Sequence, residues 1–187
     1  ICAQAELTLI WGNPMKWFPR LGGLLLLGCA TTHEGLKPVT GFEVERYMGR
    51  WYEIERVDNR FESGLTNESA DYRLLPDGKI EIIHRGYKPR QKSWSTAKGL
   101  AWFSGNKDVG SLKISFGSLI NGSYNVLAID AQYHYAMVAD TDHNDLWILS
   151  REPQLDKAIM DSLVAKAKAG GFPTNNLVYV DQKAQSK

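Results

Sequence analysis

Between residues 51 and 151, hydrophobic and polar positions alternate with the two-residue period of β-strands. Runs rich in β-branched and aromatic residues are separated by turn-forming clusters such as Pro76-Asp77-Gly78 and Asn121-Gly122. The strands that this pattern predicts are 51–57, 68–75, 79–87, 95–103, 111–117, 123–130, 133–139 and 146–151. Since most connections between them are short, we expect neighbouring strands to pair in an antiparallel meander.

The period changes to that of a helix after residue 152. A helix is predicted over 153–168, beginning near Pro153 and ending at Gly170-Gly171. One of its faces carries the apolar residues Leu155, Ile159, Leu163 and Val164. A last short strand is expected over 177–180. Because one helix cannot cover both faces of such a sheet, we expect an all-β fold closed into an up-and-down β-barrel, which is just wide enough for one small ligand.

The amino-terminal region is predicted to direct export of the chain and not to fold with the domain. Lys16 and Arg20 precede an apolar run over 21–27, which is too short to span a bilayer as a helix. The Leu-Leu-Gly-Cys sequence that ends at Cys29 resembles the lipobox of bacterial lipoproteins, in which the cysteine becomes the lipidated first residue. The alternative is an ordinary signal peptide with a cysteine there by chance.

The lipobox resemblance implies a membrane anchor on Cys29. Because Ala30 follows and no Asp stands there, the resemblance also implies sorting to the outer membrane of a Gram-negative bacterium, with the domain on the periplasmic face. The expected organisation is an upstream extension and signal peptide over 1–28, a lipidated tether over 29–40 and one domain over 41–182.

Composition and charge exclude several classes of function. Residues 1–28 hold two of the 22 basic side chains and one of the 21 acidic ones, so the remainder is neutral and has no basic run for nucleic acid. Both cysteines, Cys2 and Cys29, precede the domain, which excludes a disulfide framework, a cysteine nucleophile and a cysteine-based metal site within it. The six Trp, eight Tyr and six Phe residues are typical of a β-rich interior that is filled with side chains or holds an apolar ligand.

Two short motifs resemble signatures of the lipocalin family. Gly49-Arg50-Trp51 opens the first strand like the lipocalin G-x-W motif, and Arg151 ends the eighth strand as the third lipocalin signature does. The segments 76–80 and 124–130 are similar to bacterial lipocalins related to apolipoprotein D. The resemblance extends from about residue 39 to residue 181 and implies an eight-stranded barrel followed by a helix.

The resemblance also implies a structural role for Gly49, Trp51 and Arg151. In lipocalins the Trp/Arg pair closes one end of the barrel beneath a short helical turn, which residues 44–48 would form here. A guanidinium over an indole face gains about 0.5–2 kcal/mol and keeps its donors for backbone carbonyls. The second lipocalin signature, a turn with Thr-Asp, is incomplete, since Asp130-Ala131-Gln132-Tyr133 stands in its place.

Loops at the opposite end are expected to surround an open mouth, and these are 58–67, 88–94, 118–122 and 140–145. We expect Phe61 to point inward from the first loop, and Trp94 and Trp147 to lie at the entrance. The rim is expected to be positive, because three basic side chains belong to these loops: Arg60, Lys88 and Arg90. Strand alternation predicts a cavity wall that includes Tyr72, Tyr87, Phe116, Tyr124, Val126, Tyr135, Met137 and Trp147.

We expect no metal and no cofactor in the domain. No two histidines have metal-ligand spacing on one element, so all are expected to be solvated surface residues: His33, His84, His134 and His143. The sequence has neither a G-x-S-x-G motif nor a glycine-rich phosphate loop. Alternation leaves open whether Glu53 and Glu55 face into the barrel or outward.

These observations favour a binding protein over an enzyme. The leading hypothesis is a module that stores or transports a fatty acid or lysophospholipid, with the acyl chain inside the barrel and the head at the basic rim. One alternative is a lipocalin-fold enzyme acting on a lipid, for which Glu53 or Glu55 would be the acid–base group. The other is an envelope interaction protein with an unoccupied barrel. We expect a monomer or a weak homodimer.

Overall fold

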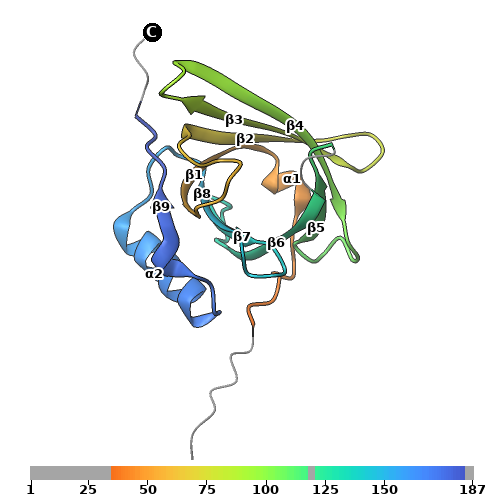
Figure 1. Cartoon of the computed structure of the whole chain (residues 1–187). Helices are drawn as coiled ribbons and strands as arrows, with labels where there is room; N and C mark the ends of the chain where they lie inside the picture. Colours follow the sequence, from red (N-terminus) through yellow and green to blue (C-terminus); the bar gives the residue numbers. More distant parts are fainter. Residues whose placement is uncertain (1–34, 118–120, 184–187) are drawn as a thin grey trace, which may run out of the picture. The chain divides into compact units, whose positions relative to one another are not determined.

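The predicted strands form one antiparallel sheet that closes on itself (Figure 1). The computed structural model describes residues 35–117 and 121–183, so Cys29 and the predicted leader lie outside the described residues. The barrel strands are β1 Gly49–Val57, β2 Thr66–Leu74, β3 Ile80–Lys88, β4 Ser93–Phe103, β5 Ser111–Ser115, β6 Asn121–Ile129, β7 Tyr135–Ala139 and β8 Leu146–Ser150. Each strand pairs with the next, and β1 pairs with both β2 and β8, which closes the barrel.

One helix packs against the outside of the barrel beside a ninth strand (Figure 1). Helix α2 (Lys157–Ala169) begins four residues later than predicted, because the Asp156 side chain accepts hydrogen bonds from the backbone N–H groups of Ala158 and Ile159 and so caps it there. It ends at Gly170, as predicted. A 3-10 turn, η1 (Thr174–Asn176), then leads into β9 (Leu177–Tyr179), which pairs with β1.

The sheet separates two hydrophobic clusters. The inner cluster fills the barrel, and its members include Trp51, Tyr72, Ile82, Tyr124, Val126, Val138 and Leu149. The outer cluster lies between the barrel and α2, and its members include Ile54, Met137, Ile148, Met160, Leu163 and Ala167. Since neighbouring residues of a strand point to opposite faces, β8 contributes Leu149 to the inside and Ile148 to the outside.

An irregularity in β1 decides which of its charged side chains enter the barrel. The pairing of β1 with β8 shifts register between Glu53 and Glu55, as a β-bulge does. Glu53 and Arg56 therefore meet on the inner side, where their side chains form an ion pair at 3.0 Å. Glu55 lies outside, close to Asp161 and Lys157 of α2, and burial raises its pKa. Because of the bulge, Glu53 faces into the barrel and Glu55 faces outward.

Strands β1 and β2 pair over only half of their length. Beyond Tyr52 they separate, and β9 takes the place of β2 beside β1. The side-chain amide of Gln182 bridges the gap, donating to the carbonyl oxygens of Glu53 at 2.7 Å and Glu68 at 2.8 Å. The carboxyl-terminal segment therefore fixes the spacing of the two strands where Glu53 and Glu68 enter the barrel.

The amino-terminal part of the described chain runs along the barrel. Val39 donates a hydrogen bond to the carbonyl of Val126 at 2.8 Å and accepts one from Gly110 at 2.9 Å, and Thr40 forms a bridge with Val109. Val39 and Thr40 therefore pair with barrel residues, while the predicted boundary of the tether at residue 40 stays a prediction. In the part of the chain that the structure describes, no helix has the length and apolar character that crossing a membrane requires.

Candidate functional site

The closed end of the barrel is built around Trp51 and Arg151, as predicted. The guanidinium of Arg151 lies 3.9 Å from the centre of the indole ring. It donates hydrogen bonds to the carbonyls of Arg50 and Arg46, both at 2.7 Å, and the indole N–H donates to Tyr47 at 2.8 Å. Arg46 and Tyr47 belong to the short helix α1 (Val44–Tyr47), which covers this end. Since the donors and the ring face are all engaged, this pair has a structural role.

Glycine is required at position 49 by the backbone. Gly49 has φ +94°, which side-chain-bearing residues rarely adopt, and an added Cβ would lie 3.4 Å from Nη1 of Arg151. The glycine of the G-x-W motif therefore lets β1 enter the sheet directly beneath the guanidinium.

A chain of buried tyrosines lies next to the closed end. The hydroxyl of Tyr124 shares hydrogen bonds with those of Tyr47 at 2.6 Å and Tyr72 at 3.0 Å. Burial raises the pKa of all three hydroxyls, so they stay neutral. Together with Trp51 they form an aromatic floor of the barrel interior. The tyrosine hydroxyls of this floor are hydrogen-bonded to one another.

A cavity lies above this floor. Its volume is about 70 Å³, and part of it is open to solvent. Its apolar lining comes from Trp51, Ala70, Tyr72, Ile82, Ile114, Phe116, Tyr124, Val138, Trp147 and Leu149. Its polar lining comes from Glu53, Glu62 and His84. Gly99 leaves room for the Phe116 ring, because a Cβ there would lie 2.7 Å from it.

The cavity brings together half of the predicted wall residues. Those that line it are Tyr72, Phe116, Tyr124 and Trp147. Val126 belongs to the inner cluster without lining the cavity. Whether these residues contact a ligand stays a prediction, but their side chains lie where a ligand in the barrel would contact them.

Tyr135 and Met137 do not line the cavity, which corrects their predicted position. Both belong to the outer cluster beneath α2. Directly paired residues of neighbouring strands share a face, and Trp147 pairs with Val138 while Ile148 pairs with Met137. Val138 therefore points inward beside Trp147, and Met137 points outward.

Tyr87 and Trp94 also lie on the outer face of the barrel. They pair with each other across β3 and β4, and their ring centroids are 5.4 Å apart. Ile82 of β3 lines the cavity, so Tyr87, an odd number of positions away, faces outward with its partner. Trp94 is 57% exposed, so its predicted place at the entrance is wrong.

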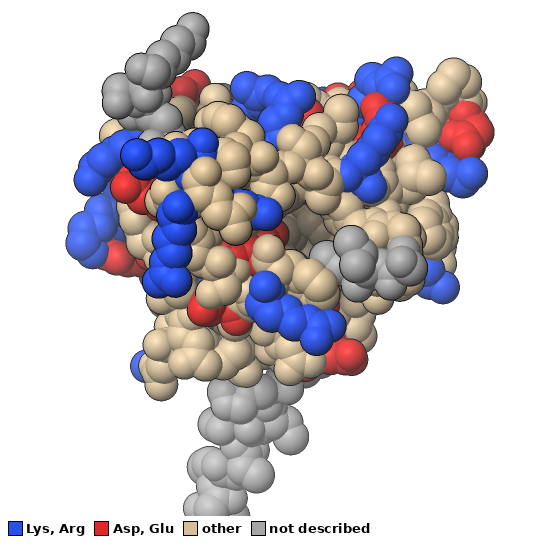
Figure 2. Space-filling view, turned by 45° about the horizontal axis from the view of Figure 1, so that its top comes forward, with Lys and Arg blue, Asp and Glu red and all other residues tan. Residues whose placement is uncertain are grey.

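The predicted rim residues do not line the cavity. Figure 2 shows a hollow on one face, with acidic atoms inside it and Lys and Arg side chains around it. Phe61 is 46% exposed and lies under the guanidinium of Arg60. Arg90 is exposed and Lys88 partly exposed. Glu62 enters the cavity from the same loop instead of Phe61, and its carboxylate accepts a hydrogen bond from the Trp147 indole at 3.0 Å.

Charged side chains form one wall of the cavity, which sequence reasoning did not foresee. We call this group the ionic cluster, and its members are Glu53, Arg56, Glu62, Glu68 and His84. Arg56 is 1% exposed and Glu68 is fully buried. The Nε atom of Arg56 lies 3.0, 3.5 and 3.8 Å from oxygens of Glu53, Glu68 and Glu62, respectively. Its other nitrogens donate to the Asp58 carboxylate at 2.8 Å and the Glu62 carbonyl at 2.6 Å.

Two carboxyl groups of the ionic cluster, those of Glu53 and Glu68, have raised pKa values. The pKa of Glu68 is raised to about 9, mainly by burial and then by the neighbouring charges of Glu53 and Glu62, against the opposing effect of Arg56. Burial also raises the pKa of Glu53, with Glu62 as the second cause. Glu53 and Glu68 therefore resist being negative together beside a single guanidinium.

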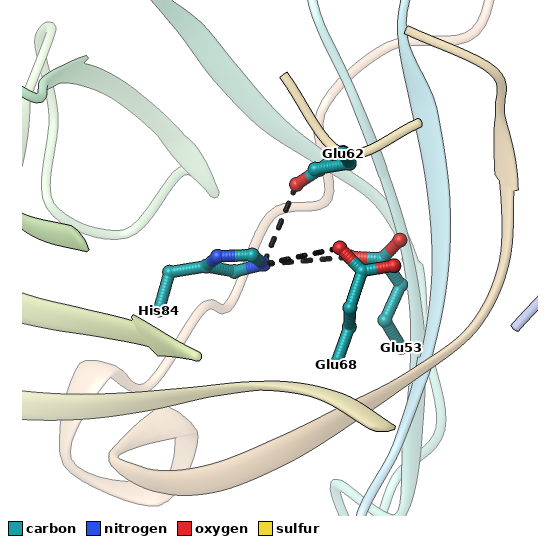
Figure 3. Close-up of side chains that lie close together, drawn as sticks. All are labelled: Glu53, Glu62, Glu68 and His84. Carbon is teal, nitrogen blue, oxygen red and sulfur yellow. Dashed lines mark ion pairs between the residues drawn. The ribbon is translucent and has the colours of Figure 1, made fainter. Parts of the chain in front are cut away.

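His84 is part of this wall and not of the surface, which corrects the prediction. Its Nε2 atom lies 3.4 Å from Glu62 and 3.9 Å from both Glu53 and Glu68 (Figure 3). The signal was present in the sequence, because Ile80 and Ile82 precede His84 at the two-residue period of β3.

Residues 42–182 match the family model for a lipocalin-like domain. The chain belongs to the lipocalin-like family. This lipocalin is 41% identical to outer membrane lipoprotein Blc of Vibrio cholerae over 164 residues, which cover 87% of this chain and 96% of that protein. It is 38% identical to Blc of Escherichia coli K12 over 160 residues, 84% of this chain and 90% of that one. The names of these relatives agree with the location expected from the lipobox.

More distant similarity supports the same fold. Mouse apolipoprotein D is 31% identical over 149 residues, 75% of this lipocalin and 77% of that protein. Insecticyanin of the tobacco hornworm superposes with a TM-score of 0.64 at 19% identity, over 78% of this chain and 84% of that one. The cockroach allergen Per a 4 superposes with a TM-score of 0.62 at 23% identity, over 79% of this chain and 92% of that one.

Proposed function

We propose that this lipocalin is a lipid-anchored protein of the bacterial envelope that binds a fatty acid or lysophospholipid inside its barrel. The observation that carries the proposal is the cavity, whose lining is mostly aromatic and aliphatic and whose floor is the Trp51 end. Each methylene removed from water contributes about 0.8 kcal/mol, so an acyl chain reaching this floor supplies most of the affinity. Part of that gain offsets the lost freedom of the bound molecule.

The distribution of charge supports an orientation with the acyl chain inward. The inner wall carries three carboxyl groups against one guanidinium, which disfavours an anionic head group inside. Arg60 and Arg90 are exposed and Lys88 is partly exposed, and the sequence places all three in loops that we expect at the mouth. An anionic or zwitterionic head group at the mouth is therefore close to positive charge and stays hydrated.

The proposed anchor is the lipid on Cys29. Two relatives that this chain resembles over most of its length are named outer membrane lipoproteins. Cys29→Ser is expected to move the protein from the membrane fraction to the soluble periplasm with its fold intact, because a lipidated amino terminus is what holds it. Unchanged membrane association of this variant would contradict the anchor.

Mass spectrometry of lipid retained by natively purified protein tests the ligand. We expect a long-chain amphiphile at one molecule per chain, released unchanged after incubation, as a binding protein releases it. Conversion of the lipid would show an enzyme, and an empty barrel would favour an interaction protein.

A matched pair of variants locates the binding. Trp147→Ala removes an indole from the cavity wall, and Trp94→Ala removes one from the outer face. A titration with a long-chain fatty acid is expected to show several-fold weaker binding for Trp147→Ala and unchanged binding for Trp94→Ala. Equal effects of the two substitutions would contradict binding in the cavity.

A further inference from the structure

The side chains of the ionic cluster are arranged in two layers. Each of the three carboxylates turns one oxygen toward Arg56: Glu53 Oε1, Glu62 Oε2 and Glu68 Oε2. Each turns its other oxygen toward Nε2 of His84: Glu53 Oε2, Glu62 Oε1 and Glu68 Oε1. Figure 3 shows the four side chains converging from different parts of the barrel, with His84 facing the three carboxylates.

Several of these buried atoms have no hydrogen-bond partner among the described residues. They are Glu53 Oε1, Arg56 Nε, both carboxylate oxygens of Glu68, and His84 Nε2. Glu68 is fully buried, so water at the surface does not satisfy its oxygens. An unsatisfied buried polar atom is costly and native proteins rarely keep one without a reason. Here the unsatisfied atoms of Glu68 and His84 point at one common space.

The spacing of the donors fits a metal ion. One ligand atom from each of Glu53, Glu62, Glu68 and His84 can be chosen so that all four lie within 4.8 Å of one another. Ligands about 2.0–2.2 Å from a zinc ion stand roughly 3.3–3.6 Å apart at the corners of a tetrahedron. The distances from His84 to the three carboxylates are 3.4 and twice 3.9 Å, and since all four ligand atoms lie within 4.8 Å of one another, closure around an ion requires shifts of up to about 1 Å.

The net charge of the ionic cluster also favours a bound cation. When all three carboxyl groups are ionised, they exceed Arg56 by two negative charges, and a bound divalent cation would neutralise this excess. Arg56 then has an orienting role, since its contacts with the far oxygens aim the near ones at His84. Glu62 and His84 line the open cavity, which gives an ion a path from solvent.

We propose that Glu53, Glu62, Glu68 and His84 form a binding site for a divalent transition-metal cation, with Zn²⁺ as the best fit. One imidazole nitrogen with carboxylate oxygens suits Zn²⁺ and Co²⁺, whereas Mg²⁺ and Ca²⁺ prefer oxygen ligands alone. The proposed metal ligands are different side chains from the apolar residues that we propose to contact the acyl chain.

Cobalt provides the direct test, because Co²⁺ replaces Zn²⁺ and its visible absorption reports tetrahedral coordination. The protein is first dialysed against a chelator and then titrated with Co²⁺, and subsequently with Zn²⁺ in competition. We expect one equivalent of Co²⁺ to give an intense visible band that Zn²⁺ abolishes. Absence of the band, together with absence of stoichiometric Zn²⁺ binding by calorimetry, would overturn the proposal and leave protons as the only neutralising cations.

Two variants and a control assign the signal to this site. His84→Asn and Glu68→Gln each remove one ligand with little change of volume, and each is expected to weaken Co²⁺ binding at least about tenfold. His134→Asn is the matched control, because His134 is an exposed histidine beside Asp130. Circular dichroism confirms the fold of each variant. Full binding by both His84→Asn and Glu68→Gln, or loss of binding by His134→Asn alone, would contradict the site.

Discussion

An arginine makes several contacts at each end of the barrel interior, Arg151 at the closed end and Arg56 toward the mouth. The groups that surround the two arginines are of different kinds. At the closed end, Arg151 lies over Trp51 and donates to backbone carbonyls that cannot change their charge. Toward the mouth, Arg56 is buried among three carboxyl groups, and several atoms around it have no hydrogen-bond partner among the described residues. The interactions of Arg151 are therefore of the kind that stabilise a fold, whereas the surroundings of Arg56 are those in which we propose a bound cation.

The largest effect is expected at the closed end. Trp51→Ala should lower the free energy of unfolding by about 3–5 kcal/mol, since it removes a fully buried aromatic side chain. Arg151→Ala should cost less, and the double variant should be less destabilised than the sum of the two, because the side chains are in contact. Urea unfolding of the four proteins measures this coupling. Strictly additive losses would show that the two residues do not act as a pair.

Arg56 gives the corresponding test toward the mouth. Arg56→Met keeps much of the volume but leaves Glu53 and Glu68 buried without their cation, so we expect a loss of about 3–4 kcal/mol in metal-free protein. Arg50→Met is a suitable control, because Arg50 forms a half-exposed pair with Asp71 and should contribute less than about 1 kcal/mol. Similar losses for the two variants would mean that burial of Arg56 has no special consequence.

The dependence of affinity on acyl-chain length tests whether the ligand reaches the Trp51 end of the barrel. A chain shortened by two methylenes should bind more than tenfold more weakly, which is about 1.6 kcal/mol, because it leaves part of the aromatic floor uncovered. Competition of a homologous series of fatty acids against a fluorescent fatty acid gives the affinities. An affinity that is independent of chain length would contradict contact with the Trp51 floor.

The smallest effect is expected at the rim. Arg90 is exposed, so Arg90→Ala should weaken binding of an anionic lipid a few-fold at most, and added salt should reduce this difference. Isothermal titration at two salt concentrations measures both. If the substitution or salt abolished binding, the head group and not the acyl chain would supply the affinity.

The strands and the closed end could be predicted from the sequence because they depend on local signals. Alternation and turn residues placed every strand within two residues of its observed bounds, and the Trp51 and Arg151 motifs predicted the pair that closes the barrel. The side of the sheet to which an individual side chain points could be predicted less well. Strand alternation predicts Met137 and Tyr87 to face inward, whereas pairing with Ile148 and Trp94 places them outside.

The ionic cluster could not be predicted, because its members come from separate elements. Glu53 and Arg56 belong to β1, Glu68 to β2, His84 to β3, and Glu62 to the loop between β1 and β2. No two of them have the spacing of a metal motif, and the bulge in β1 changes which of its residues face inward. The pairing of β1 with β2 and of β2 with β3, together with this bulge, brings them together.

The central claim, that an acyl chain enters the barrel with its methyl end toward the closed end, can be tested by fluorescence quenching. In Trp147→Phe, Trp51 is the one tryptophan of the described cavity wall, and it lies at the floor. A fatty acid brominated near its methyl end should quench the fluorescence of this variant strongly, and one brominated next to the carboxylate should leave it almost unchanged. Stronger quenching by the carboxylate-side bromine, or none by either fatty acid at saturation, would contradict the account.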